Sequence, residues 1–443
     1  MRLSDSTLAR ALAMAFLDGD WEFDPLLDRA AQVLGGRRRW VRRLVKDLLA
    51  AFPRTPRDAP SALAGWIGAH PSLIEAAARA RDAARPLRVA AIHPGHTEMG
   101  RRRWPVATLD DLADLAELLD LDQAHLAWFA DQQHRARRAP DGPLHHYRRR
   151  WISRSGRTPR LLEVPLPRLR ALQRTLTHEV LAHIPTHPAA HGFVRGRGAV
   201  TGAQQHVGRD AVLSLDLSAF FASVSAARVR AIWRAAGYPE PVADALTGVV
   251  TTLAPVRMLT AMPPGGPPEA RALLRAWLRA SHLPQGAPTS PALANLAAHR
   301  LDARLAGYAA AAGWCYTRYA DDLTISGGPE MVRRTDAVVA ALSRIVTEEG
   351  FRVNPTKTRL RTASQRQLVT GIVVNRRPGP GRSEYDQLKA LLHNASRTGG
   401  QAQNRDGHPA FAAHVRGRIA WVAQLHPERG ARLLATWHEV DWS

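Results

Sequence analysis

The sequence predicts an α+β protein that begins with a helical extension. Residues 1 to about 100 show the apolar spacing of helices joined by short polar turns. From Trp151 onward, short strand-like runs mix with helices without a regular βαβ alternation, and residues 383–443 return to a helical pattern. This order of elements is typical of the α+β class, in which helices pack at one face or end of an antiparallel sheet.

The segment RRRWVRRLVKDLLAAF (37–52) illustrates the helical pattern of the extension. Trp40, Leu44, Leu48 and Phe52 recur every four residues and define one apolar face. The opposite face is basic, and two interpretations of it remain open: a surface that binds phosphates, or a solvated helix face. The basic side chains of this face are Arg38, Arg39, Arg42, Arg43 and Lys46.

Several runs after Trp151 are rich in the β-branched and aromatic residues that favour strands. A Pro- and Gly-rich segment, NRRPGPGR (375–382), follows them and indicates a hinge or boundary. The predicted strands are LLEVP (161–165), VLSLDLSAFF (212–221), the hairpin CYTRYADDLTISG (315–327) and LVTGIVV (368–374).

Composition limits the classes of protein to consider. At 443 residues the chain has room for about two to four domains, and 45% apolar with 23% charged residues is typical of a globular protein. No apolar run reaches about 18 residues, and the N-terminus has the pattern of a capped helix rather than a signal peptide. The single cysteine, Cys315, excludes an internal disulfide and a thiolate zinc cluster. We therefore expect a cytoplasmic protein without a membrane span.

The charge balance points to a polyanionic partner. Lys and Arg number 61 against 39 Asp and Glu, which gives a net charge of +22 and a pI near 11.4. Almost all of the basic residues are arginine, a bias that a GC-rich genome can also produce. The three lysines are therefore the more informative basic residues, and they are Lys46, Lys357 and Lys389.

The hairpin at 315–327 carries two adjacent carboxylates, Asp321 and Asp322, at its tip. An Asp-Asp pair often makes only a tight turn, and Asp216 at the end of its strand would alone be interpreted as a helix cap. Together, three carboxylates on two neighbouring strands can hold two Mg²⁺ ions about 3.5–4 Å apart. Such a pair of ions activates an attacking 3′-hydroxyl and stabilises the leaving pyrophosphate.

Five short motifs, in their order along the chain, give residues 151–443 a resemblance to reverse transcriptases of the bacterial retron type. One motif alone would carry little weight, whereas five in the order of the family are specific. The motifs are LDLSAFF (215–221), LPQGAPTSPALAN (283–295), YADD (319–322), NPTKTR (354–359) and LVTG (368–371).

The resemblance implies a right-hand polymerase with fingers, palm and thumb. Fingers and palm would occupy residues 101–382, and a helical thumb that recognises RNA would occupy residues 383–443. Residues 1–100 would form a helical N-terminal extension that matches no motif of the family. This extension could hold RNA, recruit an effector protein or only support the fingers.

The resemblance also implies a set of catalytic residues. Asp216, Asp321 and Asp322 would be the ligands of two Mg²⁺ ions. Phe221 takes the position of the family's steric gate, where an aromatic wall excludes a 2′-hydroxyl and favours dNTPs, and a core phenylalanine is the alternative. Lys357 would be the general acid that protonates pyrophosphate, because lysine, unlike arginine, can give up its proton. A surface lysine retained by chance is the alternative interpretation of Lys357.

Two other segments are expected to contact the incoming nucleotide. SRSGRTPR (153–160) resembles the fingers hairpin, in which Arg154 and Arg160 would face the triphosphate as fixed cations. In the motif at 283–295, Gln285 and Gly286 would let the backbone approach the base pair closely.

Two elements resemble retron enzymes in particular and are expected to contact RNA. One is the VTG triplet. The other is an NAxxH element before the first catalytic strand, which reads GAQQH here, with Gly202 in place of the asparagine. This departure puts in doubt any RNA contact that depends on the asparagine amide. The expected RNA-binding residues are Ala203, His206, Val369, Thr370 and Gly371.

The run HVRGRIAWVAQLHPERG (414–430) resembles the retron thumb, and it also has the pattern of an amphipathic helix with Trp421 in its core. The two interpretations are compatible.

The resemblance implies an RNA-directed DNA polymerase that binds its own noncoding RNA and primes from a 2′-hydroxyl of that RNA. Its product would be single-stranded DNA attached to the RNA, made from dNTPs, in a system that defends against phage, usually with an effector protein. Three alternatives remain open: another bacterial defence reverse transcriptase with different priming, a group II intron enzyme, and a catalytically silent RNA-binding protein. The absence of a maturase or endonuclease pattern after the thumb argues against the intron enzyme.

Overall fold

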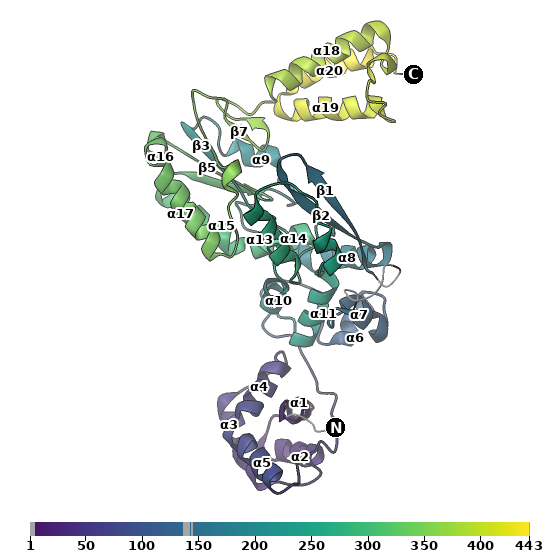
Figure 1. Ribbon diagram of the computed structural model, residues 1–443, viewed down its shortest axis with the longest axis vertical. Helices are drawn as coiled ribbons and strands as arrows, with labels where there is room; N and C mark the ends of the chain where they lie inside the picture. Colours follow the sequence, from purple (N-terminus) through teal and green to yellow (C-terminus); the bar gives the residue numbers. More distant parts are fainter. Residues whose placement is uncertain (1–4, 136–141, 143–144, 443) are drawn as a thin grey trace. The chain divides into compact units, whose positions relative to one another are not determined.

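The structure of the protein, a computed structural model, describes residues 5–135, 142 and 145–442 (Figure 1). Helices and antiparallel sheets both occur in it, which confirms the predicted α+β class. Among the helices of these ranges, none is long and apolar enough to cross a membrane. The chain divides into two compact units, the first made of Met1–Pro185 and Val224–Leu293 and the second of Thr186–Ser223 and Ala294–Ser443.

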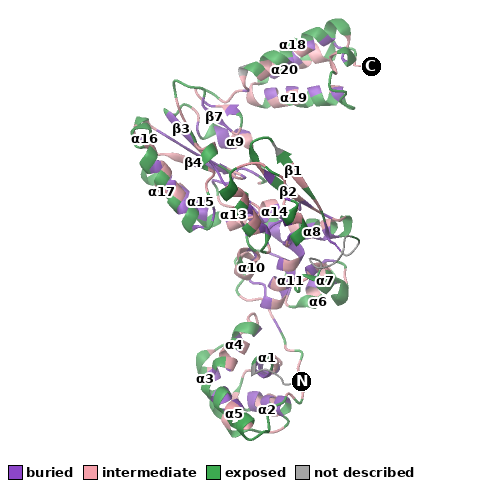
Figure 2. Cartoon of the chain, in the orientation of Figure 1, coloured by how far each residue is buried: buried purple, intermediate pink, exposed green. Residues whose placement is uncertain are grey.

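The N-terminal helices of the first unit enclose a core of their own. Leu12 and Phe16 of the first helix meet Leu44 and Leu48 of the third in this core, and all four are fully buried. Figure 2 shows the alternation of buried and exposed faces along these helices. The helix predicted over 37–52 is confirmed, with its basic face exposed. The helices are α1 (Asp5–Leu17), α2 (Phe23–Leu34), α3 (Arg39–Ala51), α4 (Pro60–Ala69) and α5 (Pro71–Asp82).

The rest of the first unit combines an antiparallel hairpin with helices. The hairpin joins β1 (Tyr147–Arg154) to β2 (Arg157–Pro165), and its register runs from Tyr147 opposite Pro165 to Arg154 opposite Arg157. The inward residues of β2 alternate with outward ones, as a half-buried strand requires. The helices are α6 (Leu112–Leu118), α7 (Gln123–Ala130), α8 (Pro167–Glu179), α10 (Ala226–Ala235), α11 (Glu240–Val250), α12 (Val256–Thr260) and α13 (Pro268–Leu278).

The second unit contains a four-stranded antiparallel sheet in the order β4-β5-β3-β6. The hairpin predicted over 315–327 supplies one central strand and one edge strand of this sheet. The strand predicted over 212–221 supplies the other central strand but ends at Asp216, and residues 218–221 form a turn. Buried apolar side chains of these strands lie in the interior. Helices α15 and α17 pack together, and α15 also contacts β4. The elements are β3 (Ala211–Asp216), β4 (Cys315–Tyr319), β5 (Asp322–Gly327), β6 (Arg359–Thr362), α14 (Ser290–Ala297, at the division between the units), α15 (His299–Ala311), α16 (Pro329–Arg333) and α17 (Thr335–Glu348).

The prediction of one strand over 368–374 is wrong. Thr370 and Gly371 adopt positive φ angles of 49° and 85°, so the run folds back on itself as the two-residue hairpin β7 (Leu368–Val369) and β8 (Ile372–Val373). Two consecutive positive φ angles are the geometry of a type I′ turn, which favours Gly at its second position.

The C-terminal helices of the second unit surround a further apolar core that includes Leu392, Val415 and Ile419. Trp421 lies in α19 and packs against the apolar cluster formed by β7, β8 and α9. The amphipathic pattern predicted for the run 414–430 is confirmed. These C-terminal helices are α18 (Arg382–Thr398), α19 (Phe411–Leu425) and α20 (Pro427–His438), whereas α9 (Ala199–Gln204) is a short helix that precedes β3.

Candidate active site

The hairpin β4–β5 presents two of the expected carboxylates. Tyr319 pairs with Asp322, so the turn consists of only two residues, Ala320 and Asp321. A two-residue hairpin turn needs a positive φ at its first central residue, and Ala320 adopts a φ of 55°. Asp321 therefore lies in the turn and Asp322 begins β5, which confirms the predicted hairpin with two carboxylates at its tip.

Strand β3 brings the third carboxylate to the same place. Asp216 is the last residue of β3 and pairs directly with Asp322 of β5. The N–H of Leu217 donates to the carbonyl oxygen of Asp321 over 2.9 Å. Asp216 is 5% exposed, whereas Asp321 is half-buried and Asp322 is exposed. The structure thus gathers Asp216, Asp321 and Asp322 at one end of two adjacent strands.

Lys357 lies directly beside Asp216. It ends a short 3₁₀ helix, Pro355–Lys357, and its Nζ is 2.5 Å from Asp216 Oδ1. The backbone N–H of Asn354 donates to the Asp216 carbonyl over 2.7 Å, and the Asn354 side chain donates to Oδ2 over 3.4 Å. A buried carboxylate needs such partners, because an unpaired buried charge is strongly destabilising. The motif at 354–359 therefore belongs to the same site as the three aspartates.

The donor set at this end of the sheet fits a divalent metal. Carboxylate oxygens are the ligands that Mg²⁺ prefers, and Mg²⁺ sites usually combine one or two carboxylates with substrate phosphates. Within the described ranges, no three His, Cys, Asp or Glu side chains already stand as a metal-binding group. Metal binding by Asp216, Asp321 and Asp322 stays a prediction, and an ion at Asp216 would compete with the Lys357 ammonium for Oδ1.

Aromatic side chains flank the aspartates. Phe220 is buried and packs on Phe351, while its neighbour Phe221 is only half-buried. The Phe221 ring lies 6.3 Å from that of Phe193, which in turn lies 6.5 Å from that of Tyr319. The core position is thus taken by Phe220, and the role of Phe221 as a steric gate stays a prediction. Phe193, 51% exposed with a φ of 61°, was missed because the run HGFVRG has no recognisable strand or helix pattern.

The residues expected to contact the nucleotide triphosphate and base belong to the first unit. Arg154 ends β1 opposite Arg157, and its side chain lies outside the described part of the chain. Arg160 is exposed on β2. The carbonyl of Gln285 accepts a hydrogen bond of 2.9 Å from the N–H of Glu163. Gly286 adopts a φ of 127°, and a Cβ there would lie 3.2 Å from the Glu163 carbonyl oxygen, so this position requires glycine.

A buried charged cluster supports this glycine-containing motif, and sequence reasoning missed it. His282 Nε2 lies 2.8 Å from Glu163 Oε2, and Arg149 Nε donates to Glu163 Oε1 over 3.0 Å. Arg149 also donates to the hydroxyl of Thr252 over 2.7 Å. Burial alone would raise the pKa of Glu163, but the interactions with His282 and Arg149 outweigh it and lower that pKa. Arg149 and Glu163 lie directly opposite each other in the β1–β2 hairpin, whereas His282 comes from a segment 119 residues further along the chain, which no local pattern links to the hairpin.

Ala203 and His206, two of the residues expected to contact RNA, are both fully buried, and their RNA contact stays a prediction. The His206 ring lies between two hydroxyls, with Nδ1 2.7 Å from Ser326 Oγ and Nε2 2.7 Å from Thr317 Oγ1. Burial, with smaller contributions from nearby positive charge, lowers the pKa of His206 to about 3. His206 therefore links the NAxxH-like element to β4 and β5 as a neutral side chain.

The three residues of the VTG triplet differ in their burial. Val369 is buried in the apolar cluster with α9. Thr370 is half-buried and Gly371 exposed, and they form the tip of the β7–β8 turn. The Thr370 hydroxyl donates to the carbonyl of Val369 over 2.8 Å. For all three residues of the triplet, the expected RNA contact stays a prediction.

The glycine that replaces the family asparagine lies against a histidine. A Cβ at Gly202 would approach His191 Cβ and Cγ to 3.4 Å, which is close contact. His191 Nδ1 lies 2.8 Å from the hydroxyl of Thr201, the residue that precedes Gly202. A Cβ at position 202 would therefore make an ordinary van der Waals contact with the His191 side chain.

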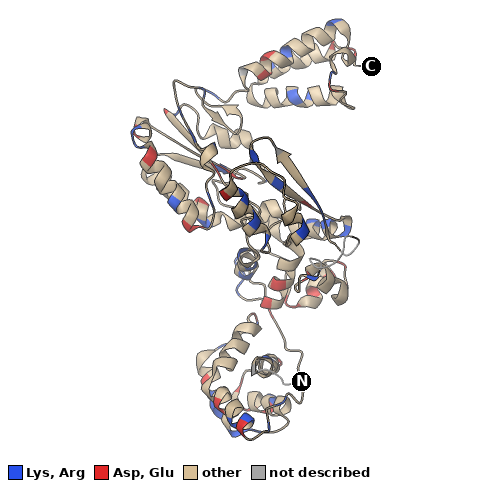
Figure 3. Cartoon of the chain, in the orientation of Figure 1, with Lys and Arg blue, Asp and Glu red and all other residues tan. Residues whose placement is uncertain are grey.

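Basic residues, blue in Figure 3, occur along both strands of the hairpin of the first unit. Arg148 and Arg150 of β1 and Arg157 and Arg160 of β2 are all exposed. Exposed cations on a rigid hairpin are suited to phosphate groups, and they agree with the polyanionic partner expected from the net charge.

Residues 152–374 match the family described as reverse transcriptase (RNA-dependent DNA polymerase). This range contains the three aspartates, Lys357 and the VTG triplet. Among solved structures, a foamy viral protease-reverse transcriptase in complex with double-stranded DNA aligns with 69% of this chain and 45% of its own, at 13% identity and a TM-score of 0.33.

The curated relatives are retron enzymes. The retron Mx65 reverse transcriptase of Myxococcus xanthus is 38% identical over 77% of this chain and 74% of its own. The retron Mx162 reverse transcriptase of the same organism is 36% identical over 78% of this chain and 70% of its own. The retron Ec86 reverse transcriptase of Escherichia coli is 28% identical over 62% of this chain and 74% of its own. The chain, with its right-hand polymerase fold, therefore belongs to the bacterial retron-type reverse transcriptases and is an RNA-directed DNA polymerase.

Proposed function

We propose that this polymerase copies part of a structured noncoding RNA into single-stranded DNA and starts from a 2′-hydroxyl of that RNA. The product is then a branched molecule in which DNA remains attached to RNA. The observation that carries the chemistry is the pairing of Asp216 with Asp322, with Asp321 in the adjoining turn. The similarity to retron reverse transcriptases supports the branched product.

Asp216, Asp321 and Asp322 act as ligands of two Mg²⁺ ions in this proposal. When bound, the two ions supply the positive charge that activates the attacking hydroxyl and stabilises the leaving pyrophosphate. Lys357 donates a proton from Nζ to the pyrophosphate oxygen as that oxygen leaves the α-phosphorus. Its position beside Asp216, at 2.5 Å, supports this role.

Nucleotide selection rests on three other groups. Phe221 excludes the 2′-hydroxyl of a ribonucleotide, which its half-buried position and its contact with Phe193 support. Arg154 and Arg160 neutralise the triphosphate as fixed cations. Gln285 and Gly286 let the backbone of this segment approach the base pair closely. The positive φ of Gly286, a conformation that suits glycine, supports this role.

We assign residues 1–100 to a helical extension, 101–382 to fingers and palm, and 383–443 to the thumb. The separate apolar cores of α1–α5 and of α18–α20 support the first and last of these assignments. The exposed tip of β7–β8, Thr370 and Gly371, contacts the cognate RNA in this proposal, while Ala203, His206 and Val369 hold that tip and the sheet in place.

The test is to purify the protein from its native locus and analyse the nucleic acid bound to it. Separate samples are treated with RNase, DNase and debranching enzyme, beside the variant Asp321→Ala/Asp322→Ala. We expect DNA that is linked to one RNA, is released by debranching and is missing from the variant. DNA without an RNA branch would instead indicate a defence reverse transcriptase with different priming. RNA alone in both preparations would indicate a binding protein.

We also propose that the product serves in defence against phage together with an effector protein. The proposal rests on the similarity to retron enzymes alone. Phage plating on cells that carry the whole locus, with and without Asp321→Ala/Asp322→Ala, tests it. Equal plating on both strains for a broad phage panel would contradict the defensive role.

A further inference from the structure

Arg318 is a fully buried guanidinium directly behind the catalytic turn. It lies in β4, three residues before Asp321, and none of its surface is exposed. A buried cation is costly unless a charge and hydrogen bonds compensate it. Asp302 of α15, also fully buried, supplies them: Nε donates to Oδ1 over 2.8 Å and Nη2 to Oδ2 over 2.6 Å. The Tyr316 hydroxyl donates to the same carboxylate over 2.8 Å.

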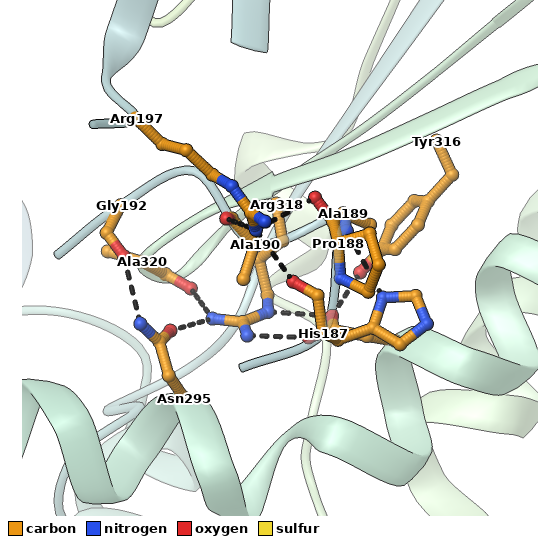
Figure 4. A network of polar contacts seen from close by, with 11 residues as sticks. His187, Pro188, Ala189, Ala190, Gly192, Arg197, Asn295, Tyr316, Arg318 and Ala320 are labelled. Carbon is orange, nitrogen blue, oxygen red and sulfur yellow. Dashed lines mark hydrogen bonds and ion pairs between the residues drawn. The ribbon is translucent and has the colours of Figure 1, made fainter. Parts of the chain in front are cut away.

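The remaining nitrogen of the guanidinium holds the turn itself (Figure 4). Nη1 donates to the carbonyl oxygen of Ala320 over 3.1 Å and to Asn295 Oδ1 over 2.8 Å. Asn295 in turn donates from Nδ2 to the carbonyl of Gly192 over 2.9 Å. Arg318 and Asn295 therefore connect two backbone segments, one of which is the catalytic turn.

Gly192 meets the turn directly as well. A Cβ built on Gly192 would lie 2.6 Å from the Ala320 nitrogen, so only the bare backbone fits there. Ala320 thus accepts a hydrogen bond from Arg318 at its carbonyl oxygen, and no side chain at position 192 would fit beside its nitrogen. These contacts surround the residue with the positive φ, Ala320. Alanine adopts such a conformation only when its surroundings hold it there.

The same guanidinium also lies against the segment that follows β3. Arg318 Cζ lies 5.6 Å from the ring centre of Phe220, the buried residue four positions after Asp216. One rigid, planar group therefore touches both the segment that follows Asp216 and the turn that carries Asp321. A rigid connection of this kind fixes the relative position of side chains that must bind one ligand together.

We propose that Arg318 is a positioning residue, which through Ala320 and Phe220 sets the spacing of Asp321 and Asp322 from Asp216 and thereby sets the affinity for divalent metal. The inference rests on the proposed metal site. A buried ion pair can often be replaced by apolar residues of similar volume without loss of stability. The role of the Arg318–Asp302 ion pair in this proposal is therefore to orient the turn.

The decisive variant is Arg318→Met/Asp302→Leu, which removes both charges together and leaves no unpaired ion. Arg318→Lys, which keeps the charge but loses the planar fork, is the second variant in case the double variant folds poorly. Tyr316→Phe is the matched control, since it removes a hydrogen bond to Asp302 but leaves the contact to Ala320 intact. Folding of each variant is checked by thermal denaturation.

The readout is Mn²⁺ binding, measured by electron paramagnetic resonance on the full chain with a primer–template that ends in a 3′-deoxynucleotide and an incoming dNTP. Because no bond can form in this complex, the measurement is independent of turnover. We expect Mn²⁺ affinity to fall about 10- to 100-fold in the folded double variant, by less in Arg318→Lys, and to change little in Tyr316→Phe.

Two results would overturn the inference: unchanged Mn²⁺ affinity in the folded double variant, or an equal loss in Tyr316→Phe. The variant Asp321→Ala/Asp322→Ala shows whether the proposed metal site itself is wrong or only the role of Arg318. If the parent protein and this variant bind Mn²⁺ equally, the proposed site itself is wrong, and the inference about Arg318 is overturned with it.

Discussion

The Nζ atom of Lys357 lies 2.5 Å from Oδ1 of Asp216, the buried carboxylate at the end of β3. Lys357 is one of only three lysines in an arginine-rich chain, and its side chain is 37% exposed. The ammonium therefore lies at the edge of the site, within reach of solvent. An arginine could also supply a positive charge beside Asp216, so the need for charge alone does not explain a lysine here.

Replacing Lys357 with arginine separates pairing from proton transfer. The introduced guanidinium keeps a positive charge beside Asp216 but holds its proton at all accessible pH values. We expect Lys357→Arg to slow single-turnover incorporation by about 100-fold, within the range of general acid catalysis, while the dNTP Kd changes by only a few-fold. Single-turnover kinetics over a series of dNTP concentrations measure both quantities.

Lys389→Arg is the matched control for this substitution, because Lys389 is exposed on α18 and its replacement makes the same chemical change away from Asp216. Incorporation by Lys389→Arg should equal that of the parent enzyme. Parent-like incorporation by Lys357→Arg would remove the general-acid role and leave Lys357 as an ion-pair partner only.

Shortening Phe221 should admit ribonucleotides. The ring is half-buried beside Phe193, so Phe221→Val removes an aromatic wall without opening a hole in the core that Phe220 fills. We expect the preference for dNTP over rNTP, as a ratio of kcat/KM values, to fall about 10- to 100-fold, typical for a steric contact of this size.

Phe193→Ala serves as the comparison for Phe221→Val. The rings of Phe193 and Phe221 lie 6.3 Å apart between centroids, so removal of Phe193 should affect sugar discrimination less. Should Phe193→Ala relax discrimination as much as Phe221→Val does, the gate would have to be assigned to the aromatic pair rather than to Phe221.

Those parts of the site that form from neighbouring residues were predictable from the sequence. The hairpin with Asp321 and Asp322 at its tip follows from strand-forming residues on both sides of an Asp-Asp pair. The turn at Thr370 was missed because the run LVTGIVV is apolar and β-branched, and only a glycine after a threonine signals its reversal. Local propensity favoured one strand, and the type I′ turn overrode it.

Long-range partners were beyond local patterns. Arg318 and Asp302 are 16 residues apart on a strand and a helix, and nothing in their neighbourhoods indicates that both are fully buried. His206 was recognised through its motif, but the motif does not reveal that its ring lies between hydroxyls of β4 and β5. In these cases the motif predicted that a residue lies near the candidate active site. It did not predict whether the side chain of that residue is exposed or buried.

A methyl group at Gly286 should destabilise the first unit. The residue has a φ of 127°, and a Cβ would come within 3.2 Å of the Glu163 carbonyl oxygen, which belongs to the strand that carries the buried charged cluster. We expect Gly286→Ala to lower the free energy of unfolding by about 1–3 kcal/mol, the usual cost of a strained backbone position. Denaturation by urea, followed by circular dichroism, measures the change.

Gly307→Ala provides the control for Gly286→Ala. Gly307 is exposed in helix α15, and a Cβ at this position would meet no atom within 4 Å. Alanine favours the helix over glycine by about 0.5–1 kcal/mol, so this variant should be slightly more stable. Equal effects of the two substitutions would contradict the assigned strain at Gly286.

The pKa of His206 makes a specific contribution to the pH dependence of stability. Burial lowers that pKa to about 3, below the value of 6.5 of an unperturbed histidine. Between these values the unfolded chain binds a proton at His206 that the folded chain does not. The contribution of His206 to stability is therefore fully present above pH 6.5 and is lost as the pH falls toward 3. His206 alone should lower the free energy of unfolding by about 1.4 kcal/mol per pH unit within that window.

The variant His206→Gln, which cannot titrate, isolates this contribution. Urea denaturation at several pH values across the acidic side of neutrality should show a shallower dependence of stability on pH for the variant than for the parent. His191 and His146, whose pKa values are also lowered by burial, remain in both proteins, so the difference between the two slopes reports His206. Identical slopes would mean that the ring is protonated in the folded protein, and the hydrogen bonds to Ser326 and Thr317 would then have to be donated by an imidazolium.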